Sequence, residues 1–245
     1  MLSVPISIIL HTLRVKKVNK LKLYLYLKAI SSGQIKLSDE VQKSVCVAMK
    51  WKDKRTFKSN LSWLLKHHWA TYNSNTHSLR IISFRQLNRQ IHGSVRTGVR
   101  MNMEDFNYFR HFIYAAAITW SQIAIKGAEK RKSKCKRGRS KKSHPYSHFS
   151  KMPLDYLAKI IKLDKSTISK NKSAAALDEY IKVHHQYENL YRKARYINVM
   201  RSYADEDLAK RLVIHNGRVH IQLPDIIHSS LKLVYLKRLY KNQQQ

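Results

Sequence analysis

The sequence predicts a mainly helical protein with small β-hairpins. Glycine and proline are scarce, at 6 and 4 of 245 residues, and this scarcity favours long regular elements over low-complexity disorder. Apolar residues make up 43% of the chain, which is enough for real cores, and several segments repeat them at helical spacing. A chain of this length is expected to form two small domains or one larger domain.

The first expected elements are a helix, a short strand and a second helix. The apolar run over 19–32 is followed by Gly33, which is typical of a helix end. Residues 34–37 can form the short strand. The second helix is expected to begin at Ser38 and to run to about Met49, because a serine followed by two acidic residues suits free backbone amides and the helix dipole.

A third helix and a hairpin complete the first unit. From Asp53 onward, apolar residues recur at i, i+4, i+7 and i+8, which places them on one face of a helix. The runs 69–72 and 79–84 are extended and are separated by a polar turn, so they predict a hairpin. This order of elements resembles that of winged-helix proteins, and we expect a winged-helix-like domain over residues 15–92.

A long helix and a basic segment are expected to separate this unit from the rest of the chain. Residues 102–128 carry an apolar stripe and predict a connecting helix, with a homodimer helix over 104–128 as the alternative. Residues 129–148 are rich in lysine and arginine and cannot bury themselves, so they predict a flexible linker. A second winged-helix domain is expected over 149–245.

The segment 152–183 predicts a helix-turn-helix. A short amphipathic helix, a tight polar turn and a second helix follow one another. Ala158 is small where the helices must cross, and Leu163 and Ile168 are apolar after the turn and inside the second helix. The segment therefore resembles the helix-turn-helix and winged-helix families of DNA-binding proteins. The alternative is an ordinary helical hairpin in a basic protein.

Two residues depart from the usual pattern of this motif. Lys162 stands where the turn usually carries glycine, so it must adopt a strained backbone or a slightly different turn. Asn171 stands at a position of the second helix that is usually apolar. Both departures bear on which residue occupies each position of the motif, and not on whether the motif is present.

The remainder predicts a wing, a hairpin and a final helix. Residues 180–184 are expected to form a strand, 185–195 a basic wing tip and 196–200 the return strand. The pair Asn-Gly at 216–217 lies between two apolar runs and predicts a type I′ hairpin. Residues 224–240 predict a helix that opens on proline.

The charge of the chain indicates a polyanionic partner. Lysine and arginine total 48 against 15 acidic residues, which gives a formal net charge of +33. Nucleic acid is the favoured partner, with an anionic membrane surface as its rival. The apolar runs are too short to span a bilayer, and the N-terminal segment lacks the order of a secretory signal, so a cytoplasmic protein is expected.

The candidate site residues are expected on and beside the two second helices, on the first hairpin, in the wing tip and in the linker. Lys170 and Asn171 are the candidates for base contacts, because lysine donates to guanine and asparagine pairs with adenine. Hydroxyl groups near a helix start can bind phosphate. The residues expected to contact DNA are Lys165, Ser166, Thr167, Ser169, Lys170, Asn171, Lys172, Lys52, Lys54, Arg55, Lys58, Asn60, Arg80, Arg192 and Lys193. In the linker, phosphate contacts are expected from Arg131, Lys132, Lys134, Lys136, Arg137, Arg139, Lys141 and Lys142.

These observations favour a sequence-specific duplex DNA-binding protein. Tandem winged helices with a basic bias look like the replication initiators of plasmids and mobile elements, and a transcriptional regulator of a mobile element or phage is equally compatible. An RNA-binding or packaging protein is the alternative.

We expect no enzyme, no cofactor and no metal site. The HxxR motif of tyrosine recombinases occurs at 77–80 and 215–218, but both copies fall on predicted hairpins, which is the wrong context for that catalysis. Cys46 and Cys135 are far apart in the sequence, so neither a zinc site nor a disulfide framework is indicated.

Overall fold

The protein is described by a computed structural model that covers residues 1–93, 97–136 and 149–236. About 53% of it is helical and 25% is strand, and the strands form three small antiparallel sheets. The protein is therefore mixed α/β, and the prediction of a mainly helical fold with small hairpin wings is wrong. The extra strand content comes from one sheet that the sequence did not indicate and from two strands that are much longer than a small wing.

One arrangement of elements occurs twice in the chain. The first copy consists of α2 (Val18–Ile30), β2 (Gln34–Lys36), α3 (Asp39–Met49), α4 (Lys54–Lys66), β3 (Ala70–Asn73) and β4 (Ser78–Ile81). The second consists of α6 (Phe109–Lys136), β6 (Phe149–Lys151), α7 (Leu154–Ile161), α8 (Lys165–Leu177), β7 (Ile181–Lys193) and β9 (Arg218–Ser229). The sheet orders β2-β4-β3 and β6-β9-β7 correspond, since the last strand lies in the middle of each. Both copies thus repeat the order of elements expected for residues 19–84.

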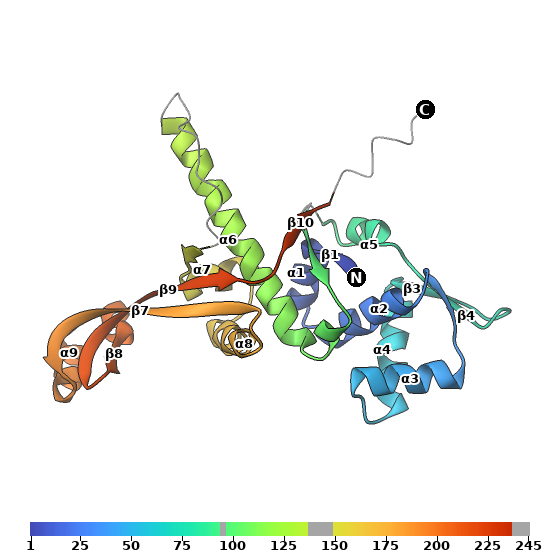
Figure 1. Cartoon of the computed structure of the whole chain (residues 1–245), viewed down its shortest axis with the longest axis horizontal. Coiled ribbons are helices and arrows are strands. Elements are labelled where there is room, and N and C mark those ends of the chain that lie inside the picture. Colours follow the sequence, from blue (N-terminus) through green and yellow to red (C-terminus); the bar gives the residue numbers. More distant parts are fainter. Residues whose placement is uncertain (94–96, 137–148, 237–245) are drawn as a thin grey trace.

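A third sheet joins the two ends of the described chain. It has the order β1-β5-β10 and pairs β1 (Leu2–Pro5) and β10 (Leu233–Tyr235) with opposite edges of β5 (Thr97–Met101). The remaining elements of this region are α1 (Ile6–Arg14), α5 (Phe84–Gln90) and η1 (Glu104–Phe106). In Figure 1, β1 and β10 lie close together near the middle of the molecule, with β5 between them in the sheet, so the chain returns to where it started.

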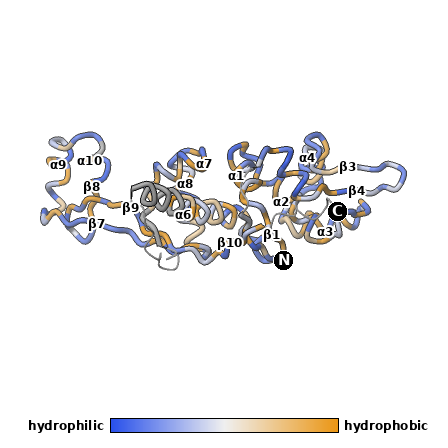
Figure 2. Tube along the Cα trace, turned by 90° about the horizontal axis from the view of Figure 1, so that it is seen from above, coloured by the Kyte–Doolittle hydropathy of each residue, from blue (hydrophilic) through white to orange (hydrophobic). Residues whose placement is uncertain are grey.

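The predicted domains 15–92 and 149–245 share one hydrophobic core. Its buried side chains include Leu64 of α4, Phe112 of the connecting helix α6 and Ile168 of α8. The Arg14 guanidinium also donates to the Ile160 carbonyl over 3.0 Å, which ties α1 to α7. Figure 2 shows the helical parts side by side in one row, from α9 (Ile197–Tyr203) and α10 (Glu206–Arg211) through α7 and α8 to α1 and α2.

Helix α6 begins in the centre of the molecule, and its second half projects away from it (Figure 1). Its first half is covered by the chain itself, since residues 112–118 are each at most 5% exposed, so little of the face considered for a homodimer over 104–128 is free. The helix continues to Lys136 and therefore reaches eight residues into the segment 129–148 that was expected to be a flexible linker. Residues 137–148 lie outside the described residues.

Strands β7 and β9 form a long ribbon that ends in a small lobe (Figure 1). The lobe contains η2 (Ala194–Tyr196), α9 (Ile197–Tyr203), α10 (Glu206–Arg211) and β8 (Leu212–His215). It has its own small core around Ile197, Leu212 and Val219. The return strand expected at 196–200 is therefore wrong, because Ile197 anchors a helix in this core.

The helix expected over 224–240 is also wrong for its described part, residues 224–236. Strand β9 runs through Pro224, and β10 follows. The pairing shifts there, since His184 faces Ile226 while Gln186 faces Leu223. Pro224 lies in this bulge, where a residue without an N–H group is tolerated in a sheet.

Candidate nucleic-acid interface

The helix-turn-helix expected at 152–183 is formed by α7 and α8. Leu157, Ile161 and Ile168 are fully buried between the helices and the core. Helix α7 ends at Lys162, whose backbone is left-handed with φ 61° and ψ 51°. The Lys162 and Leu163 amides both donate to the Ala158 carbonyl, over 2.8 and 3.3 Å. Lys162 therefore adopts the left-handed backbone conformation that glycine usually provides at this position of the turn.

The pair α3 and α4 repeats this turn. Helix α3 ends at Lys50, which is also left-handed with φ 57° and ψ 37°, and the Trp51 amide donates to the Cys46 carbonyl over 2.9 Å. Asp53 caps α4 through a bond from the Arg55 amide, while Asp164 is the N-cap residue of α8. Both helix pairs therefore place a lysine in the turn and an aspartate at the start of the second helix.

The left-handed turn makes Lys162 a site of backbone strain. A side chain in this conformation costs about 1–2 kcal/mol relative to the right-handed region, and glycine avoids that cost. We expect Lys162→Gly to raise the free energy of unfolding by up to about 1 kcal/mol in urea denaturation, after the greater unfolded-state entropy of glycine is allowed for. The matched control is Lys159→Gly, which lies inside α7 and should lower stability by about 1 kcal/mol. Equal losses in both variants would contradict the assignment.

The first turns of α8 present most of the expected DNA contacts to solvent. Lys165, Ser166 and Lys170 are exposed, and Thr167 and Ser169 are half-buried. Lys165 lies 2.6 Å from the Asp155 carboxylate, but both side chains are well exposed and the pair leaves them accessible. Helix α8 carries no acidic residue in its first turn, and its N-cap residue Asp164 makes no side-chain cap bond, so the amides of the first turn stay available to a ligand.

Two of the expected contacts on α8 are buried instead. Asn171 is 8% exposed, and its Nδ2 donates to the Thr167 carbonyl over 2.6 Å. Lys172 is 7% exposed, and its ammonium forms an ion pair with Asp225 of β9. Because both side chains face the core, neither is available to contact DNA.

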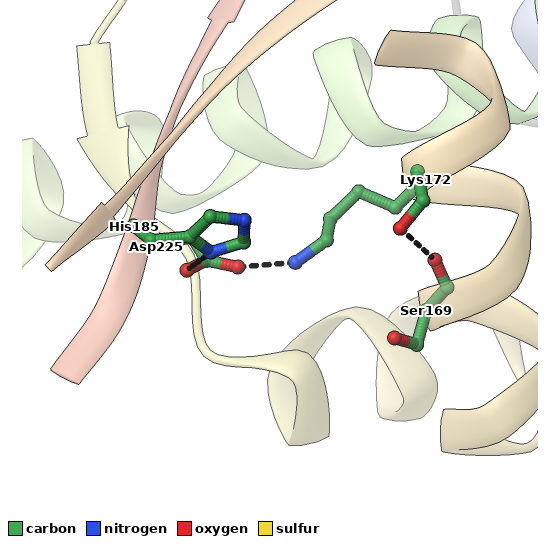
Figure 3. A network of polar contacts seen from close by, with 5 residues as sticks. Ser169, Lys172, His185 and Asp225 are labelled. Atoms are coloured by element: carbon green, nitrogen blue, oxygen red, sulfur yellow. Dashed lines mark hydrogen bonds and ion pairs between the residues drawn. The ribbon is translucent and has the colours of Figure 1, made fainter. Parts of the chain in front are cut away.

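Asp225 connects the second helix of the motif to the ribbon, as Figure 3 shows. Its Oδ2 accepts from Lys172, and its Oδ1 accepts from His185 Nδ1 of β7 over 2.8 Å. The Asp225 carbonyl accepts from the Met152 amide, just before α7, over 2.9 Å. This one residue therefore holds α8, β7 and the start of α7 together, so it fixes the angle at which α8 is presented.

The expected contacts of the first copy are mostly exposed. Lys52, Lys54, Arg55 and Lys58 line the outer side of the turn and of α4, and Arg80 is exposed on β4. Lys54 is 3.6 Å from Asp39, in an exposed pair. Asn60 is only 3% exposed and accepts from Lys20 over 2.5 Å, so it faces away from the outer side of α4.

The remaining basic candidates that the structure describes belong to elements outside both helix pairs. Arg192 and Lys193 are exposed at the end of β7, beside the small lobe. Arg131, Lys132, Lys134 and Lys136 belong to the last turns of α6. Arg137, Arg139, Lys141 and Lys142 lie outside the described residues.

Two groups of polar residues were not expected from the sequence. One is the Lys172–Asp225–His185 network, whose partners are far apart in the chain. The other is a basic cavity beside the start of α2, described below; its visible signal is the close spacing of Lys16, Lys17 and Lys20. Across the described ranges, no three His, Cys, Asp or Glu side chains lie close enough to hold a metal ion.

No protein-family model matches this chain, and neither a curated protein nor a solved structure matches it. Function must therefore be inferred from geometry and charge. Within residues 1–93, 97–136 and 149–236, we find no helix with the length and apolar content that a membrane span requires.

Proposed function

We propose that this protein binds duplex DNA, with α8 and α4 as the helices that enter the major groove. The observation that carries the proposal is the α7–α8 pair, whose second helix exposes Lys165, Ser166 and Lys170 at its N-terminal end. The major groove is wide enough for an α-helix, and in helix-turn-helix proteins the N-terminal residues of the second helix contact the base edges. The net charge of +33 supplies the attraction to the backbone.

The exposed residues of α8 divide into two roles in this proposal. Ser166 and the free amides of the first turn bind a phosphate, helped by the positive end of the helix. Lys170 lies one turn further along and donates to guanine acceptors. Lys162 projects from the turn between the helices and adds a phosphate contact. On α4, the exposed residues Lys54, Arg55 and Lys58 lie in the first turns and take the same roles.

Two such units in one chain favour a target with two half-sites. The repetition supports the resemblance to replication initiators of plasmids and mobile elements, and we propose a cytoplasmic role in starting replication or regulating transcription at the bound site. This biological role is inferred from the order of elements, whereas DNA binding is inferred from the exposed face of α8.

Selection of bound sites from a random duplex pool, with the full chain at physiological salt, tests the proposal. We expect a recurrent motif with two half-sites, bound at least a hundredfold more tightly than random duplex. Equal binding of selected and random duplex would show non-specific packaging instead. Stronger competition by structured RNA than by the selected duplex, at the same salt concentration, would identify an RNA-binding protein.

A further inference from the structure

A basic cavity of about 270 Å³ lies where the α1–α2 turn meets α4 and α6. Its walls carry the cationic side chains of Lys16, Lys17, Lys20 and Arg110 and the amides of Asn19 and Asn60. The cavity is on the inner side of α4, since it reaches the buried Asn60, whereas the α4 residues proposed for DNA are exposed on the outer side. It is therefore distinct from the major-groove face.

The four cations converge without a counter-charge. No acidic side chain lines the cavity, and none of the four forms an ion pair within the part of the chain that the structure describes. Burial, and secondly the neighbouring charge of Lys17, lower the pKa of Lys20. Like charges gathered around a partly enclosed space repel one another, and a bound anion removes that repulsion.

The cavity also offers backbone donors. Helix α2 begins at Val18 with no side-chain cap and no acidic residue in its first turn. The Val18 and Asn19 amides have no acceptor among the described residues. Free amides and the helix dipole together favour an anion at this position.

The Asn60 side chain adds a polar group to the cavity wall. Its side chain is 3% exposed, and its Oδ1 accepts from Lys20 Nζ over 2.5 Å. Its Nδ2 group has no acceptor in the described part of the chain, although the residue forms part of the cavity wall. Because this Nδ2 is not among the fully buried unpaired atoms of the described residues, it reaches the cavity and can donate to an anion held there.

We propose that this cavity is a binding site for a phosphate-bearing anion, with room and charge for two linked phosphates. A phosphate monoester carries about −1.5 to −2 at neutral pH, so four cations exceed what one phosphate neutralises. The volume of the cavity is slightly below the range of small-molecule pockets, about 300–1,000 Å³, which suits a diphosphate group rather than a whole nucleotide. Both a free diphosphate compound and a nucleic-acid backbone present this chemistry.

Isothermal titration of the full chain with inorganic pyrophosphate, at fixed ionic strength, tests this site. We compare the wild type with the double variant Lys17→Gln plus Arg110→Gln and with the control Lys43→Gln, which removes an exposed lysine outside the cavity. We expect one pyrophosphate per chain in the wild type and the control. In the double variant the affinity should be at least tenfold lower, and circular dichroism should confirm that it remains folded.

A second measurement distinguishes the two sources of phosphate. If pyrophosphate does not bind, the slope of log affinity for duplex DNA against log salt is measured for the same proteins. A slope reduced by about 2 in the double variant but not in the control assigns the cavity to the DNA backbone. No pyrophosphate binding together with an unchanged slope would overturn the proposal. Because the titration contains no DNA, its result is independent of the proposed DNA-binding function.

Discussion

Asp225→Ala should lower the free energy of unfolding by about 3–5 kcal/mol. Asp225 is 6% exposed and accepts from both Lys172 and His185. Its removal leaves the Lys172 ammonium buried without a counter-charge, and desolvation of that charge is then uncompensated. Urea denaturation of the full chain with linear extrapolation measures the loss.

Two further variants isolate the effect of burial. Asp155→Ala removes an exposed aspartate of the same motif, whose pair with Lys165 is 2.6 Å long, and should change stability by at most about 1 kcal/mol. The double variant Lys172→Met plus Asp225→Leu removes both buried charges and should recover most of the loss. If Asp155→Ala and Asp225→Ala destabilise the protein equally, the buried ion pair contributes no more to the free energy of unfolding than the exposed pair does.

Ser166→Ala plus Lys170→Ala should abolish most of the preference for the selected duplex over random duplex. Each lost base contact is expected to reduce specific binding by about 1–3 kcal/mol, whereas the lost phosphate contact weakens binding to all sequences alike. The affinity for the selected site should therefore fall about 10- to 100-fold more than that for random duplex. Fluorescence anisotropy with both duplexes at one salt concentration measures the difference.

Lys159→Ala is the matched control for this experiment. Lys159 is exposed on α7 and carries the same charge, but it lies outside α8. Its loss should weaken both duplexes to the same small extent. If the double variant keeps the full preference of the wild type, α8 does not read the sequence, and the ribbon and the first helix pair become the candidates.

The helix pairs could be predicted because their signals are local. Ser38 accepts from the Val41 amide over 3.2 Å, as its position before two acidic residues indicated. Asn216 and Gly217 have positive φ angles of 48° and 71°, as a type I′ turn requires. Each of these signals depends only on residues within four positions, so it can be recognised in the sequence without knowledge of the tertiary structure.

The buried face of each second helix could not be predicted in full. Lys172 faces the core because Asp225, 53 residues away in the chain, provides its counter-charge. Asn60 is covered for a similar reason, since Lys20 lies 40 residues away. A lysine or an asparagine is ordinarily a surface residue, and only the tertiary partner makes its burial tolerable.

The proportions of helix and strand also could not be predicted from local sequence patterns. Strands β1, β5 and β10 are 3 to 5 residues long, which is too short to establish an alternating pattern. Pro224 was taken for the first residue of a helix, because proline suits that position as well as it suits a bulge. The choice between them depends on the pairing of β9 with β7, which forms between distant segments.

The pairing of β5 with β10 has a consequence for synthesis on the ribosome. Strand β5 receives β1 on one edge early, but its other edge stays open until residues 233–235 have been made. During this interval the nascent chain exposes unpaired backbone groups at residues 97–99, and an open edge readily pairs with another chain. We therefore expect incomplete chains to aggregate when several ribosomes translate one message at the same time. Once β10 has paired with β5, this edge is no longer exposed.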